Sequence, residues 1–149
     1  MLNISQIKQL REETGAAVMD CQKALEQSNG DFPKAKIWLE KKGFERAEKK
    51  ADRETGQGLI EAYVHGTGKV GALIALSCET DFVARTPEFK NLAHELVMQA
   101  AAMEPKDVKE LLAQEYIRDP KIKIADLIKQ TIAKLGENIK IANVSRLKL

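Results

Sequence analysis

The stretch LIEAYVHGTGKVGALIALSCE, residues 59–79, decides the fold of this chain. It contains two apolar runs of strand character, 59–65 and 70–79, separated by the four residues GTGK. Glycines in a short polar connection between two such runs are typical of a β-hairpin. We therefore expect two antiparallel strands here.

Three helical patterns precede this hairpin. The first ends at Gly15 and the second at Gly30, where glycine permits the turn that follows a helix. The third begins with Asp31 as its cap, and we expect Gly43 to end or bend it. Trp38 lies on the inward stripe of this third helix, which predicts a core residue of a compact three-helix module.

The link between module and hairpin is charged and then rich in glycine. Residues 44–54 are dense in Ala, Glu, Lys and Arg, which predicts a solvated connecting helix. Gly56 and Gly58 follow and mark the expected domain boundary. We expect a helical domain over 1–55 and an α+β core over 56–149.

An acidic residue and a large aromatic residue follow the hairpin, in the order Thr80, Asp81, Phe82 and Val83. A new helix is expected to start at Thr86, so Phe82 falls at a corner between a strand and a helix. Such corners lie on the surface and often carry function, whereas isolated aromatic residues are mostly buried. The hydrophobic periodicity and the capping signals are compatible with both an exposed, functional Phe82 and a buried one.

Helical and extended patterns alternate in the remainder. A long amphipathic helix follows Thr86, a short helical segment lies between the prolines of 105–120, and another helix starts at Ile124 and closes at Gly136. A half-buried terminal strand is expected to place four apolar residues on one side, namely Ile139, Ile141, Leu147 and Leu149. This strand should join the hairpin in an antiparallel sheet packed against helices.

Composition narrows the class of protein. Hydrophobic residues make up 44% and charged residues 31% of 149 residues, which is typical of a globular protein. We expect no membrane span, no signal peptide and a cytoplasmic location. Residues 105–149 carry ten basic and six acidic side chains, which keeps a basic-tailed RNA-binding module as an alternative, beside a helical adaptor.

Catalytic chemistry finds little support in the sequence. Cys21 and Cys78 lack metal-ligand spacing, and the two histidines fall in different elements. Glu79 and Asp81 could form a carboxylate pair, although an acidic loop is the simpler interpretation. We expect no enzyme, no bound metal and no cofactor.

Three separated strings carry a family resemblance. They are LREETGA with MDC and KAL at 10–25, CETDFVA at 78–84, and IAKLGENI at 132–139. Together they resemble the signatures of the bacterial elongation factor Ts family in its short-core form. The resemblance implies a guanine-nucleotide exchange factor of translation elongation, which binds elongation factor Tu with GDP and promotes GDP release.

The resemblance also implies roles for residues. Thr80, Asp81, Phe82 and Val83 match the family wedge, whose aromatic ring disturbs the Mg²⁺ and phosphate site of elongation factor Tu. A module like a ubiquitin-associated domain would dock on the same partner through residues matching Leu10, Arg11, Val18 and Met19. Short-core members are expected to form homodimers and to bind neither nucleic acid nor membrane. We expect the dimer seam at the terminal strand with Ile139 and Ile141, because an unpaired strand edge invites pairing.

Overall fold

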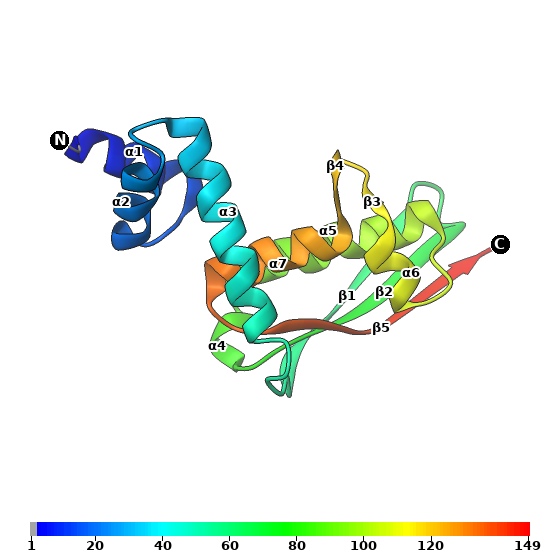
Figure 1. Cartoon of the computed structure of the whole chain (residues 1–149). Coiled ribbons are helices and arrows are strands. Elements are labelled where there is room, and N and C mark those ends of the chain that lie inside the picture. The colour runs from blue at the N-terminus through cyan, green and yellow to red at the C-terminus, as the bar shows by residue number, and fades with distance from the viewer. Residues whose placement is uncertain (1–2) are drawn as a thin grey trace.

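The computed structural model describes residues 3–149, which form two parts of different architecture (Figure 1). Three helices at the amino terminus enclose one group of buried side chains, and the later elements form a sheet covered by helices. The expected α+β class is confirmed. Residues 1 and 2 of the expected module 1–55 lie outside the described residues.

The amino-terminal helices are α1 (Ile4–Thr14), α2 (Val18–Gln27) and α3 (Phe32–Lys49). Their predicted ends are confirmed at Gly15, which ends α1 in the left-handed conformation, and at Asp31, whose side chain accepts from the Lys34 N–H. The shared core consists of Leu10, Cys21, Ala24, Leu25, Ala35 and Leu39. Trp38 is half-buried against this core, as its place on the inward stripe predicts.

Within the described residues the main sheet contains β1 (Gln57–His65), β2 (Val70–Cys78) and β5 (Ile139–Lys148), in the order β1-β2-β5. Both pairings are antiparallel, so the predicted hairpin and terminal strand are confirmed. Gly66 and Gly68 adopt φ of 48° and 83°, which glycine permits in the tight connection. Strand β2 is thus central, and its carboxyl end leads to Thr80.

Strand β5 carries a bulge that changes which face its side chains occupy. Ala142 has no partner on β2, because the register shifts at this point. Ile139 and Ile141 point into the core, whereas Leu147 and Leu149 are exposed. The prediction that these four residues share one side is therefore wrong. Ile139 and Ile141 are buried, so their side chains are not available to the expected dimer seam, although β5 is an edge strand of the sheet.

Helices cover one face of this sheet. They are α4 (Asp81–Ala84), α5 (Pro87–Met103), α6 (Val108–Ala113) and α7 (Ile124–Leu135). Figure 1 shows α5 and α7 on the same side of the sheet. Thr86 caps α5 by accepting from the Phe89 N–H, and Gly136 ends α7 at a φ of 77°, as predicted. Phe89, in the first turn of α5, is completely buried.

A second small hairpin, β3 (Glu115–Tyr116) with β4 (Asp119–Lys123), was not expected from the sequence. The interpretation of 105–120 as one short helical segment between prolines is correct only for α6. Gln99 of α5 explains the extra pairing, since its buried side chain accepts from the Ile117 N–H and donates to the Glu115 carbonyl. This anchor is distant in sequence.

Helix α3 runs through Gly43 without a break, so the prediction that this residue ends or bends the helix is wrong. Gly43 faces α7, where an added Cβ would lie 2.9 Å from the Cβ of Ala133. The expected separate helix over 44–54 is instead the second half of α3, which ends at Lys49. Ala47 is buried against the sheet part, so this half is not fully solvated.

Candidate protein-binding site

The ring of Phe82 projects into solvent from the corner between β2 and α5, with 81% of the residue exposed. Phe82 lies in α4, a helix of a single turn. Thr80 caps this turn, because its hydroxyl accepts from the Val83 N–H at 3.3 Å. The interpretation of Phe82 as a buried residue is thereby excluded.

The other three residues of the expected wedge divide into two kinds. Asp81 is exposed and its carboxylate pairs with the Arg85 guanidinium one turn later. Thr80 and Val83 are half-buried, and Val83 packs against the core of the sheet part. The turn therefore presents a charged and an aromatic side chain outward while its remaining residues face the protein.

Glu137 holds the start of this turn. One carboxylate oxygen accepts from the Thr80 N–H at 2.9 Å and the other accepts from the Thr80 hydroxyl at 2.7 Å. Hydrogen bonds to a charged acceptor are shorter and stronger than neutral ones. We call these two hydrogen bonds the Thr80–Glu137 clasp.

Glu79 makes a second contact between the end of β2 and the residues that follow α7. Its carboxylate accepts from the Asn138 N–H at 2.8 Å and lies 3.5 Å from the Arg53 guanidinium. Asp81 is engaged separately with Arg85, so Glu79 and Asp81 do not form a catalytic carboxylate pair. The buried side-chain amide of Asn138 donates to the carbonyls of Ala51 and Arg53. These contacts fasten the corner to the segment that follows α3.

Cys78 lies beneath the corner but is not a reactive thiol. It is completely buried, and its Sγ donates to the Thr80 carbonyl at 3.1 Å. Burial, followed by the negative charge of Glu137, raises the pKa of the Cys78 thiol. A raised pKa disfavours the thiolate that nucleophilic chemistry needs.

The amino-terminal module has a second exposed apolar site, at the start of α2. Val18 and Met19 are both substantially exposed, and Arg11 at the end of α1 is exposed as well. Leu10 is completely buried in the module core, so the expectation of direct contact with a partner does not fit Leu10. Its place on the apolar stripe of α1 explains this difference.

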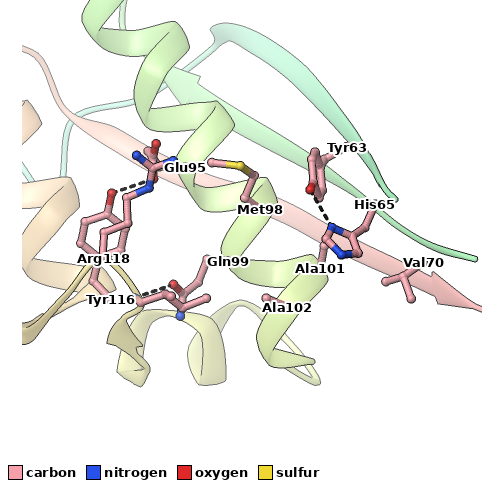
Figure 2. A pocket seen from close by; sticks show the side chains of 11 residues that line it. Tyr63, His65, Val70, Glu95, Met98, Gln99, Ala101, Ala102, Tyr116 and Arg118 are labelled. Carbon is pink, nitrogen blue, oxygen red and sulfur yellow. Dashed lines mark hydrogen bonds and ion pairs between the residues drawn. The ribbon is translucent and has the colours of Figure 1, made fainter. Parts of the chain in front are cut away.

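A cavity of about 400 Å³ lies beside α5 and the β3–β4 hairpin (Figure 2). Its buried polar groups are already engaged, since Tyr116 donates to the Glu95 carboxylate and Gln99 bonds the hairpin backbone. The cavity lies near His65 and Val70, at the end of the β1–β2 hairpin opposite the Phe82 corner. It is therefore separate from the exposed ring.

Residues 3–149 contain no group of three or more His, Cys, Asp or Glu side chains arranged to hold a metal ion. In the same part of the chain, no helix combines the length and apolar character needed to cross a membrane.

Comparison with known proteins identifies the family. A family model described as "Elongation factor TS" matches residues 79–149. An elongation factor Ts from Coprothermobacter proteolyticus is 42% identical over 190 aligned positions, which cover 97% of this chain and 96% of the relative. The chain belongs to the elongation factor Ts family. An elongation factor Ts from Thermotoga neapolitana is 44% identical, with 94% of this chain and 93% of the relative covered.

Membership of the elongation factor Ts family confirms the expected function as a nucleotide exchange factor of translation elongation. The chain is nevertheless shorter than the aligned part of the Coprothermobacter relative. The alignment with the Coprothermobacter elongation factor Ts spans 190 positions, more than the 149 residues present here, so that relative has positions without a counterpart.

Two structural features were not predicted from the sequence. Glu137 and Asn138 belong to a matched string, but neither periodicity nor charge indicated that they reach the Phe82 corner. The exposed apolar face of the sheet, which carries Ile60, Val64, Leu73 and Leu147, was also not predicted. The near-continuous apolar run of β2 was a usable signal for it, because such a run is typical of a strand with apolar side chains on both faces.

Proposed function

We propose that this elongation factor Ts family member promotes GDP release from elongation factor Tu by inserting the Phe82 ring into the partner's GTP-binding domain. The observation that carries this proposal is the exposed Phe82 ring on a turn whose first residues are held by the hydrogen bond from the Thr80 N–H to Glu137. Insertion displaces groups around the Mg²⁺ and phosphate site of the partner. In this proposal the chain acts by binding its partner and not as an enzyme.

Reciprocal coupling explains how a protein contact releases a nucleotide. If the exchange factor binds the nucleotide-free partner more tightly than the GDP-bound partner, GDP affinity must fall by the same factor once the exchange factor is bound. Burying a Phe side chain contributes about 1.5–3 kcal/mol. A contact made only in the open partner therefore suffices to accelerate release severalfold or more.

The three-helix module within 1–55 supplies the docking contact in this proposal, and 56–149 carries the wedge. Val18 and Met19 offer adjacent apolar side chains at the start of α2, and the exposed Arg11 at the end of α1 is available to an acidic group. Two separate groups of buried side chains support the division, although α3 contributes Ala47 to the second. Leu10 belongs to the buried core of this module.

The test is release of a fluorescent GDP analogue from elongation factor Tu. The wild type should accelerate release, and Phe82→Ala should lower the saturated rate about 30-fold, as expected for an interface hot spot worth about 2 kcal/mol. Ile37→Ala is the matched control, since Ile37 is also an exposed apolar residue but lies on α3. Unaltered release in the presence of the wild type contradicts the proposal.

A homodimer through the outer face of the sheet completes the proposed assembly, with each dimer serving two partner molecules. This face carries four exposed apolar side chains, namely Ile60, Val64, Leu73 and Leu147. Pairing places Ala62 opposite Leu73 and Gly71 opposite Leu147, so the apolar patch continues across all three strands. A patch poor in charge can meet its own copy across a two-fold axis without repulsion.

Solution mass tests the dimer. The wild type should have twice the chain mass of 16.6 kDa, and Leu73→Lys should yield the monomer because two lysines would meet near the axis. Ile37→Lys introduces the same charge on α3 and should leave the dimer intact. A monomeric wild type at micromolar concentration contradicts this assembly.

The alternative functions receive less support. Basic residues of 105–149 are partly neutralised, since Arg118, Lys129 and Arg146 pair with Glu95, Glu48 and Glu104. Such pairing reduces the attraction for a phosphate backbone. An exposed Trp38 would favour the adaptor interpretation, but Trp38 is half-buried in the module. We therefore propose a cytoplasmic protein without direct nucleic-acid or membrane binding.

A further inference from the structure

The position of the Phe82 ring depends on contacts made by its neighbours in sequence. With 81% of the residue exposed, the ring is not fixed by packing. Helix α4 has only four residues, and an isolated helical turn is unstable because nucleation is unfavourable. The ring is therefore placed by whatever fixes Thr80 and the start of the turn.

The Thr80–Glu137 clasp fixes that start. Both carboxylate oxygens of Glu137 accept hydrogen bonds from Thr80, one from its backbone N–H and the other from its hydroxyl. The same hydroxyl accepts from the Val83 N–H, so one side chain joins the clasp to the cap of α4. Because the Thr80 hydroxyl donates its proton to Glu137, the lone pairs of the hydroxyl oxygen remain free to accept from the Val83 N–H.

A second contact makes the bracing reciprocal. Glu79 accepts from the Asn138 N–H, while Glu137 accepts from the Thr80 N–H. Each glutamate thus bonds the backbone N–H of the residue that follows the other glutamate. Two hydrogen-bonded crossings between 79–80 and 137–138 resist sliding and twisting better than one. The end of α7 and the end of β2 are locked together at the Phe82 corner.

We propose that Glu137 is a positioning residue for nucleotide exchange, which acts through Thr80 to hold the Phe82 ring ready for insertion. This inference rests on the proposed wedge function. Loss of the clasp leaves the docking surface at Val18 and Met19 intact. It therefore lowers the saturated exchange rate and leaves the half-saturating concentration of exchange factor nearly unchanged.

The decisive variant is Glu137→Gln, which keeps the side-chain length but replaces one acceptor with a donor facing Thr80. We expect a saturated exchange rate about tenfold below the wild type, the effect of losing one charge-assisted hydrogen bond. Thr80→Val removes the hydroxyl from the other side, and the double variant should lose less than the product of the two single effects. Glu48→Gln, which breaks an exposed ion pair with Lys129, is the matched control and should retain the wild-type rate.

Hydrogen exchange at the Thr80 and Val83 amides supplies a readout that needs no partner protein. Both amides should exchange faster in Glu137→Gln while the amides of central strand β2 keep their protection. The inference is overturned if Glu137→Gln releases GDP from the partner as fast as the wild type does. It is also overturned if the Thr80 and Val83 amides keep their wild-type protection from hydrogen exchange. Failure of the wild type itself to accelerate GDP release would instead overturn the underlying wedge function, so the two failures are distinguishable.

Discussion

Gly43 of α3 packs directly on Ala133 of α7, and a Cβ added to Gly43 would lie only 2.9 Å from the Ala133 Cβ. Real Cβ atoms do not approach so closely, so the helices can keep this separation only with glycine at position 43. Figure 1 shows α3 running from the amino-terminal helices to α7. The contact between Gly43 and Ala133 sets how closely the two parts approach.

Gly43→Ala should destabilise the protein even though alanine is the better helix former. The gain in helix propensity is about 1 kcal/mol, but overpacking costs about 1–3 kcal/mol. We expect a net loss of about 1 kcal/mol in the free energy of unfolding, measured by urea denaturation.

The reverse substitution provides the control. Ala133→Gly alone should cost about 1 kcal/mol through helix propensity, and combining it with Gly43→Ala should restore stability to within about 0.5 kcal/mol of the wild type. Additive losses in the double variant contradict the contact. Recovery would show that the two sites share one space.

Gly58→Ala should be far more damaging. Gly58 adopts a φ of 146°, and an added Cβ would lie 2.0 Å from the Leu76 carbonyl oxygen in the paired strand. Because the obstacle is backbone, no side-chain change can relieve it, and we expect a loss of about 3 kcal/mol or more in unfolding free energy. Gly56→Ala is the control, since nothing lies within 4 Å of its added Cβ. Equal melting temperatures for the two variants contradict the prediction.

Elements specified by local signals were predictable from the sequence. The hairpin, the cap at Thr86 and the end at Gly136 each depend on residues within one or two turns of chain. The prediction for Gly43 was wrong because a distant residue, Ala133, decides whether that glycine breaks a helix or permits close packing. The bulge at Ala142 likewise arises from pairing with β2. Alternation along one strand cannot reveal it.

The site was predictable only in part, for a similar reason. Capping placed Phe82 at a corner, but its exposure depends on how the turn packs, and only the family resemblance favoured an outward ring. Leu10 was assigned to the surface by resemblance, although its apolar stripe already indicated burial. The Thr80–Glu137 clasp spans 57 residues and has no local signal.

An ion pair between Asp20 and Arg46 should make the stability of the three-helix module depend on pH. The Arg46 guanidinium donates to both Asp20 oxygens, at 2.6 and 2.9 Å, and lowers the pKa of Asp20. A lowered native pKa stabilises the fold above the unfolded-state pKa of about 3.9, and this stability is lost as pH falls through the native pKa. Water screens the half-exposed Arg46, so we expect about 1 kcal/mol or less.

Urea denaturation of Asp20→Asn measures this contribution. The wild type should be more stable than the variant at pH 7, and the difference should close as the pH falls from about 5 to below the native pKa. Asp52→Asn, at an exposed position, controls for the loss of one carboxylate. A difference that is independent of pH over this range contradicts the ion-pair explanation.

Tyr116 should lose its phenolic proton at a higher pH than an ordinary tyrosine does. Burial first, and then the hydrogen bond and negative charge of Glu95, raise the pKa of Tyr116 to about 12. An unfolded tyrosine ionises near pH 10, so between about pH 10 and 12 only the unfolded state loses the proton. The free energy of unfolding should therefore fall as the pH rises through this window.

Phenolate absorbance in Tyr63→Phe isolates this group, because the chain has two tyrosines and Tyr116 is then the remaining one. The folded variant should show its midpoint near pH 12, and the urea-unfolded variant near pH 10. Adding Glu95→Gln should move the folded midpoint downward, since it removes the negative charge that opposes ionisation. A folded midpoint near pH 10 before that change would mean that the phenol does not donate to Glu95, and that the β3–β4 hairpin is not anchored to α5 through this contact.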